Sequence, residues 1–147
     1  FSYACLKFSL QSDVDLSSAK LEKILRLIGH HLSIANDLAS YEKEWRDFSS
    51  GKIRHLINIV AIVQKIDRTV SDTAKATCYG RQLETERLIL EELERMKRVD
   101  ELSVSEWEFV DAALGMAAGN IFTSVVISRY GGEAARIGGG PCHGIGL

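Results

Sequence analysis

The chain has 147 residues, of which 46% are hydrophobic and 26% are charged, and this composition is typical of one soluble globular domain. The net charge of −2 argues against a protein that tracks nucleic-acid phosphates, so we expect no nucleic-acid partner. The three cysteines exclude a disulfide framework and indicate a reducing compartment, which we take to be the cytoplasm.

The two ends of the chain predict a fragment with a separate tail. The sequence begins with Phe1 and shows no signal peptide, so we expect a piece of a longer protein. We expect residues 1–132 to form the folded part and the Gly-rich residues 133–147 to be disordered. The uncharged stretch Ala112 to Ser128 is at the lower limit for a membrane span, and we interpret it as a core helix.

Two helices are expected in the first half of the chain. The first begins after a cap at Asp15 or Ser17 and ends at the Ser49-Ser50-Gly51 break. Its apolar positions recur every three or four residues, at Leu21, Ile24, Leu25, Ile28, His31, Leu32, Ala35, Leu38 and Ala39. The second has an apolar side made of Ile53, Leu56, Ile57, Val60 and Val63.

Two longer helices are expected in the second half. One begins at a cap at Ser71 or Asp72 and ends near Arg98, with a charged outer face and with Leu83, Leu90 and Leu93 beneath it. The other opens with the capping box Ser103 to Glu106 and is stopped by Gly131-Gly132. Because it is apolar nearly all round, we expect it to be central. The sequence therefore predicts an all-α chain of four main helices.

Three oxygen-bearing side chains recur at a spacing of four in the first helix. Asn36, Ser40 and Glu44 each advance about 40° around the axis, so they share one face over two turns. Such a face suits Mg²⁺, which binds few protein ligands and keeps waters or substrate oxygens. Lys43 lies about 20° from Asn36 and can neutralise a phosphate beside the metal. On spacing alone, an ordinary solvated polar face remains the alternative.

The nine residues from Asn36 to Glu44 resemble the second metal-binding motif of class I terpene cyclases, (Asn/Asp)-Asp-x-x-(Ser/Thr)-x-x-x-Glu. The form Asn-Asp-Leu-x-Ser-Tyr-x-Lys-Glu is similar to fungal sesquiterpene cyclases of the aristolochene synthase type. The pair Arg129-Tyr130 resembles the end of the last long helix of these enzymes. The resemblance covers about residues 17 to 132 and implies the C-terminal half of an isoprenoid-synthase helical bundle.

The resemblance implies roles for the matching residues. Asn36, Ser40 and Glu44 would chelate one Mg²⁺ of a three-metal cluster. Lys43, Arg129 and Tyr130 would hydrogen-bond the diphosphate of a prenyl diphosphate, and Arg129 and Tyr130 are the catalytic candidates. The implied reaction of the whole enzyme is the ionisation of farnesyl diphosphate and cyclisation of the cation to a sesquiterpene, with water excluded.

The sequence also departs from the family. No aspartate-rich motif (Asp-Asp-x-x-Asp/Glu) is present, and Asp13-Val14-Asp15 lacks its spacing. We therefore expect these 147 residues to be inactive by themselves. Two alternatives stay open. One is a non-catalytic helical module that binds partners or forms a homodimer through an exposed apolar face. The other is a cyclase for a prenyl diphosphate of another length.

Overall fold

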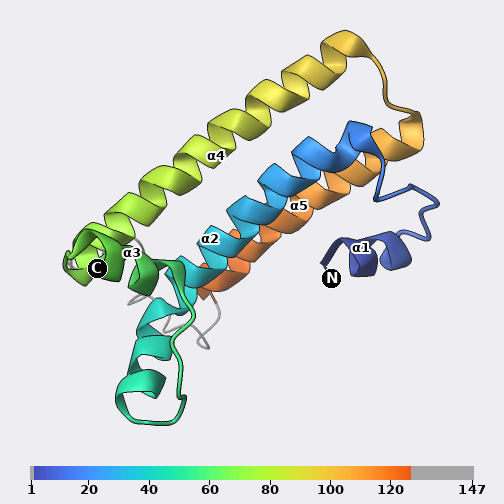
Figure 1. The fold of residues 1–147 in the computed structure, drawn as a ribbon. Coiled ribbons are helices and arrows are strands. Elements are labelled where there is room, and N and C mark those ends of the chain that lie inside the picture. Colours follow the sequence, from blue (N-terminus) through green and yellow to red (C-terminus); the bar gives the residue numbers. More distant parts are fainter. Residues whose placement is uncertain (1, 127–147) are drawn as a thin grey trace, which may run out of the picture. The chain divides into compact units, whose positions relative to one another are not determined.

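The computed structural model describes residues 2–126, and all of the regular structure in this range is helical (Figure 1). The helices in chain order are α1 (Ser2–Ser9), α2 (Ala19–Ser49), α3 (Ile59–Asp67), α4 (Ser71–Val99) and α5 (Val104–Val126). The predicted all-α class is confirmed and is consistent with the helical bundle that the resemblance implies. Arg129, Tyr130, the Gly131-Gly132 stop and the tail 133–147 lie outside the described residues.

The chain divides into two compact units. Of the described residues, the first unit contains 2–33 and 82–120, and the second contains 34–81 and 121–126. The helices α2, α4 and α5 each contribute residues to both units.

The first unit is built around the first half of α2. Buried α2 side chains at spacings of three and four pack against one face of α5 and against α4, and Figure 1 shows α2 and α5 running side by side. The core residues are Leu21, Ile24, Leu25, Leu27 and Ile28 of α2, Ile89 and Met96 of α4, Phe109, Val110, Ala113 and Ala117 of α5, and Val14. The predicted apolar positions of α2 in this unit are thus confirmed.

The helix α5 differs from the expected central helix. Its buried residues fall on one stripe, while Gly115, Ala118 and Phe122 on other sides are exposed. The expected start is confirmed, because Glu106 Oε2 accepts a hydrogen bond from Ser103 N at 2.8 Å and Ser103 Oγ accepts one from Glu106 N at 3.3 Å. The capping box is therefore formed. The helix α5 has more apolar side chains than the described residues bury.

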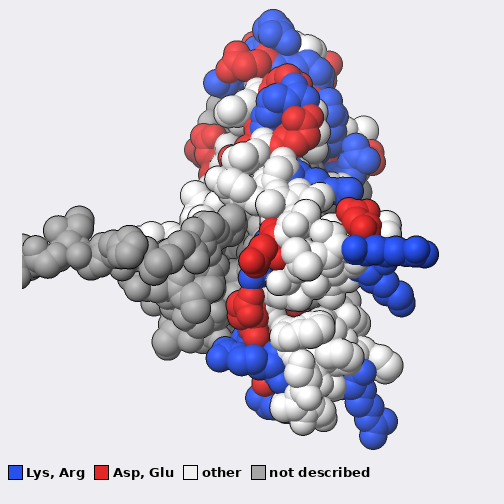
Figure 2. All heavy atoms as spheres, turned by 90° about the vertical axis from the view of Figure 1, so that its left-hand side faces the viewer, with Lys and Arg blue, Asp and Glu red and all other residues white. Residues whose placement is uncertain are grey.

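The helix α4 has the predicted bounds but a different buried face. Leu83 is exposed and Leu90 is 64% exposed, whereas the polar residues Gln82, Thr85 and Glu92 are buried. The placement of Leu83 and Leu90 beneath the charged surface was wrong. Two of these buried polar side chains, Gln82 and Glu92, have polar partners within the unit. Figure 2 shows basic and acidic side chains interspersed over the upper part of the face that it draws.

Two polar networks supply those partners. Glu92 is 1% exposed and forms ion pairs with Lys23 at 2.5 Å and Arg95 at 2.7 Å. His31 is buried, and its Nε2 lies 2.8 Å from Glu86 Oε1 and 3.3 Å from Gln82 Nε2. His31 is therefore part of the interior of this unit.

The second unit packs the second half of α2 against α3 and the start of α4. Its core consists of Leu38, Tyr41, Val60, Val63, Ala74 and Cys78. The break after α2 is confirmed at Gly51, whose φ of 76° is in the left-handed region that favours glycine. The predicted second helix begins later than expected, because Asn58 caps α3 and leaves Ile53, Leu56 and Ile57 in the connecting segment.

Among residues 2–126, no helix combines the length and the apolar character needed to span a membrane.

Candidate functional site

The second unit contains the predicted metal-binding face of α2. The helix is continuous from Ala19 to Ser49, so the i, i+4, i+8 spacing of Asn36, Ser40 and Glu44 keeps them on one side of it. Ser40 is only 3% exposed, and Asn36 and Glu44 are half-buried. This face is thus a partly buried surface, and it differs from the fully solvated face of the alternative interpretation.

The hydroxyl of Ser40 is a buried polar atom without a hydrogen-bond partner among the described residues. A helical serine often satisfies its hydroxyl by donating to the carbonyl four residues earlier, as Ser33 does to Gly29 O at 3.0 Å. Ser40 does not. A buried polar group of this kind needs an explanation, and an ion or water that binds it is one of the few available. Asn36 and Glu44, four residues before and after Ser40, both carry side-chain oxygens.

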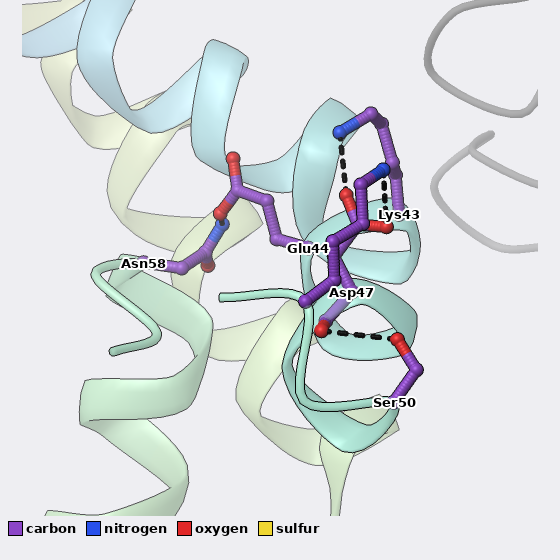
Figure 3. Close-up of polar contacts among 6 residues, drawn as sticks. Lys43, Glu44, Asp47, Ser50 and Asn58 are labelled. Atoms are coloured by element: carbon purple, nitrogen blue, oxygen red, sulfur yellow. Dashed lines mark hydrogen bonds and ion pairs between the residues drawn. The ribbon is translucent and has the colours of Figure 1, made fainter. Parts of the chain in front are cut away.

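Glu44 is held by a residue that the sequence analysis did not single out. The side-chain amide of Asn58 donates a hydrogen bond from Nδ2 to Glu44 Oε2 at 3.1 Å (Figure 3). The same Nδ2 donates to the Asp37 carbonyl oxygen at 2.8 Å. The Oδ1 atom of Asn58 accepts from Val60 N at 2.9 Å and caps α3. The sequence signal was an Asn directly before an apolar helical run, which is typical of an N-cap.

Asp37 is the second site residue that sequence reasoning missed. Its carboxylate points to α3, where Oδ2 accepts a hydrogen bond from Ile59 N at 2.8 Å. Burial raises the pKa of this carboxyl group and the charge of Glu44 raises it further, whereas the hydrogen bond from Ile59 acts in the opposite direction. Two carboxylates therefore lie close enough to interact on this part of α2, and a cation nearby would favour the charged form of both.

The Lys43 side chain is directed to Asp47, away from the contact between Glu44 and Asn58 (Figure 3). Its Nζ pairs with Asp47 Oδ2 at 2.8 Å, and Lys52 Nζ pairs with Asp47 Oδ1 at 3.1 Å. Hydrogen bonds from Lys43 and Lys52 lower the pKa of Asp47. A phosphate that recruits Lys43 would therefore compete with Asp47, which keeps Lys52 as a second partner.

The chemistry of the donor set is compatible with a magnesium ion. Asn36, Ser40 and Glu44 offer an amide oxygen, a hydroxyl and one carboxylate, which are hard oxygen ligands of the kind that Mg²⁺ takes. Within residues 2–126, no group of three or more His, Cys, Asp and Glu side chains is placed to hold a metal. One carboxylate with two neutral oxygens makes a weak site for a cation alone, so phosphate oxygens would have to complete the coordination.

Comparison with known proteins relates the chain to terpene cyclases. Terpene cyclase aneC of Aspergillus aculeatus is 29% identical to it over 121 residues, which cover 82% of the chain. The matched residues correspond to 27% of that protein, so the chain spans about a quarter of the length of this relative. No model of a known protein family matches the chain. The similarity and the all-helical fold together support a relationship to the terpene cyclases.

Proposed function

We propose that this chain supplies one magnesium-binding face and part of the diphosphate pocket of a terpene cyclase. The observation that carries the proposal is the buried Ser40 hydroxyl, which lacks a partner among the described residues and lies between Asn36 and Glu44. A cation bound by the three side chains would satisfy that hydroxyl. The similarity to terpene cyclase aneC supports the terpene cyclase part of the proposal.

In this proposal, one set of residues binds the metal and another binds the diphosphate. Asn36, Ser40 and Glu44 hold one Mg²⁺ of a three-metal cluster, and Lys43, Arg129 and Tyr130 hydrogen-bond the diphosphate. The metal, when bound, neutralises the charge that develops on the departing diphosphate. Lys43 exchanges its ion pair with Asp47 for one with the diphosphate, and the Lys52–Asp47 pair keeps Asp47 neutralised after that exchange.

The finer assignment follows the form of the motif. We propose farnesyl diphosphate as substrate, a sesquiterpene as product and an aristolochene synthase type of fungal enzyme as the parent. Free thiols at Cys5 and Cys78 support a reducing compartment, and we propose the cytoplasm. Because residues 1–147 contain no Asp-Asp pair, we also propose that they form no terpene by themselves.

The metal assignment is tested by Mn²⁺ binding in the presence of inorganic pyrophosphate, followed by electron paramagnetic resonance of the Mn²⁺. Glu44→Gln removes the carboxylate, and we expect at least a tenfold loss of affinity. Glu22→Gln, at an exposed position of the same helix, is the matched control and should bind as the unaltered chain does. Equal affinities of all three proteins, or no binding by the unaltered chain, would refute the proposed site.

The inactivity of the isolated chain has its own test. We expect no volatile terpene, measured by gas chromatography with mass spectrometry, after incubation of the 147-residue chain with Mg²⁺ and farnesyl diphosphate. Product formation at enzymatic rates would show that the aspartate-rich motif is not required. Repeating the incubation with geranyl and geranylgeranyl diphosphates addresses the alternative of a different substrate length.

A second candidate function is a non-catalytic helical module, and exposed apolar side chains of the second unit favour it. Ile57 is 84% exposed, and Ile66 and Val70 are also largely exposed. Apolar side chains in such positions are typical of surfaces that bind another protein or a second copy of the chain. Sedimentation velocity that shows a dimer, together with no affinity for Mn²⁺ and pyrophosphate, would replace the cyclase proposal by this one.

A further inference from the structure

We propose that Asn58 is a positioning residue of the candidate metal site, which it serves by fixing the carboxylate of Glu44 from the start of α3. This inference rests on the proposed function. It concerns a residue that lies 14 positions after Glu44 and outside the motif that suggested the site.

The hydrogen bonds determine which way the Asn58 amide faces. Val60 N is a donor, so the atom that it contacts at 2.9 Å is the acceptor Oδ1. The NH₂ group then faces α2, where it reaches Asp37 O at 2.8 Å and Glu44 Oε2 at 3.1 Å. The side chain is 1% exposed, so water does not compete with these bonds. Every hydrogen-bonding group of this amide is therefore engaged.

Only asparagine among the common capping residues can make all three contacts. Serine, threonine and aspartate also accept the bond from the backbone N–H that caps a helix. A hydroxyl has a single hydrogen to donate and a shorter reach, and an ionised aspartate has none. The NH₂ group has two hydrogens, which suffice for both the Asp37 carbonyl and the Glu44 carboxylate. Capping of α3 alone would therefore not require asparagine at position 58.

A second contact fixes the same part of α3 against α2. Ile59 N donates to Asp37 Oδ2 at 2.8 Å, next to the Asn58 bond to the Asp37 carbonyl. The start of α3 therefore holds α2 at Asp37 and again at Glu44, seven residues or about two turns apart. The predicted ligands Asn36, Ser40 and Glu44 span the same two turns.

The contact constrains the carboxylate of Glu44 without occupying it. The bond from Asn58 engages Oε2, and among the described residues Oε1 has no such partner. A glutamate side chain has several rotatable bonds, and fixing them costs conformational entropy. Without the bond from Asn58, this entropy would be lost when the metal binds. Hydrogen bonds that orient a metal-ligating carboxylate commonly change metal affinity by ten- to a hundredfold when removed.

The test is a double-mutant cycle on Mn²⁺ affinity with inorganic pyrophosphate present. Asn58→Ser keeps a capping oxygen and removes the amide donors, and we expect affinity to fall about tenfold. In the Glu44→Gln background, Asn58→Ser should cause no further loss, because the carboxylate through which it acts is gone. Ser103→Thr, which alters the cap of α5 and preserves its hydroxyl, is the control and should leave affinity unchanged.

The outcomes separate the inference from the proposed function. If the unaltered chain does not bind Mn²⁺ with pyrophosphate, the proposed function fails and the inference fails with it. If the unaltered chain binds and Asn58→Ser binds equally well, only the inference fails. An equal loss in both backgrounds shows a structural effect that does not pass through Glu44, and it also overturns the inference.

A measurement on the unaltered chain avoids dependence on the folding of the variants. The side-chain NH₂ of Asn58 gives two proton signals in a nitrogen-15 correlation spectrum. Titration with Mg²⁺ and pyrophosphate should shift both signals, with the same midpoint as the backbone signals of Glu44. Asn58 signals that stay fixed while those of Glu44 move would overturn the proposed positioning role.

Discussion

Replacement of Ser40 by alanine tests the candidate site most directly, because it should affect stability and metal affinity in opposite directions. Burial of an unpaired hydroxyl costs about 1–3 kcal/mol, and Ser40 is 3% exposed with no partner for Oγ among the described residues. Alanine is also the better helix former by about 0.5 kcal/mol. Loss of one oxygen atom leaves little space. We expect the free energy of unfolding of the metal-free chain to rise by about 1.5–3.5 kcal/mol, the sum of these two contributions.

The assay is urea unfolding followed by circular dichroism, first with a chelator and then with Mn²⁺ and pyrophosphate. Ligands that bind only the folded chain stabilise it in proportion to their affinity, so the addition should stabilise the unaltered chain more than Ser40→Ala. Ser33→Ala, at an exposed position of the same helix, is the control for helix propensity. A metal-free Ser40→Ala that is less stable than the unaltered chain would show that the hydroxyl has a partner and would refute the reasoning. Greater stability with unchanged metal affinity would refute the ligand role alone.

Three further predictions concern the first unit. Glu92→Gln should lower stability by about 2 kcal/mol at pH 7, because it removes charged hydrogen bonds. Bonding to Arg95 holds the pKa of Glu92 below its usual range, so this contribution is fully present above the unfolded pKa and is lost as pH falls through the folded pKa. In urea titrations the difference in stability between the two proteins should therefore shrink on acidification. Ser103→Ala should cost about 1 kcal/mol, measured by thermal unfolding, because it removes the cap of α5. Burial raises the pKa of Tyr3 to about 12, so the stability that the folded chain loses between pH 10 and 12 should be smaller in Tyr3→Phe, as urea titrations over that range would show.

Local sequence patterns predicted the long helices well because their ends carry local signals. The Ser49-Ser50-Gly51 break and the capping box at Ser103 act on the backbone within a few residues, and both are present where the sequence placed them. The buried stripe of α2 also follows from periodicity alone, because its residues are apolar and contact the core directly.

The errors arose where a partner distant in sequence decides what is buried. From its local sequence, Glu92 is expected to belong to a charged surface. It is buried, and Lys23 on another helix neutralises it there. From the same local pattern, Leu90 is expected in the core, but it is exposed. The start of α3 carried a local signal, an Asn before an apolar run, and only the contacts of Asn58 with Asp37 and Glu44 on the preceding helix depend on distant partners.

In the candidate site too, some features follow from the local sequence and others depend on residues that are distant in the sequence. The alignment of Asn36, Ser40 and Glu44 on one face requires only a continuous helix, and the structure provides it. The orientation of Glu44 requires α3 to return to α2, and neither this contact nor the burial of Ser40 is encoded in the spacing of the motif. A polar triplet at this spacing is common on exposed helices, but burial of its middle hydroxyl and a hydrogen-bonded carboxylate at its end are not expected of a solvated face. The buried Ser40 hydroxyl and the contact of Asn58 with Glu44 therefore support the proposed metal site over an ordinary polar surface on this helix.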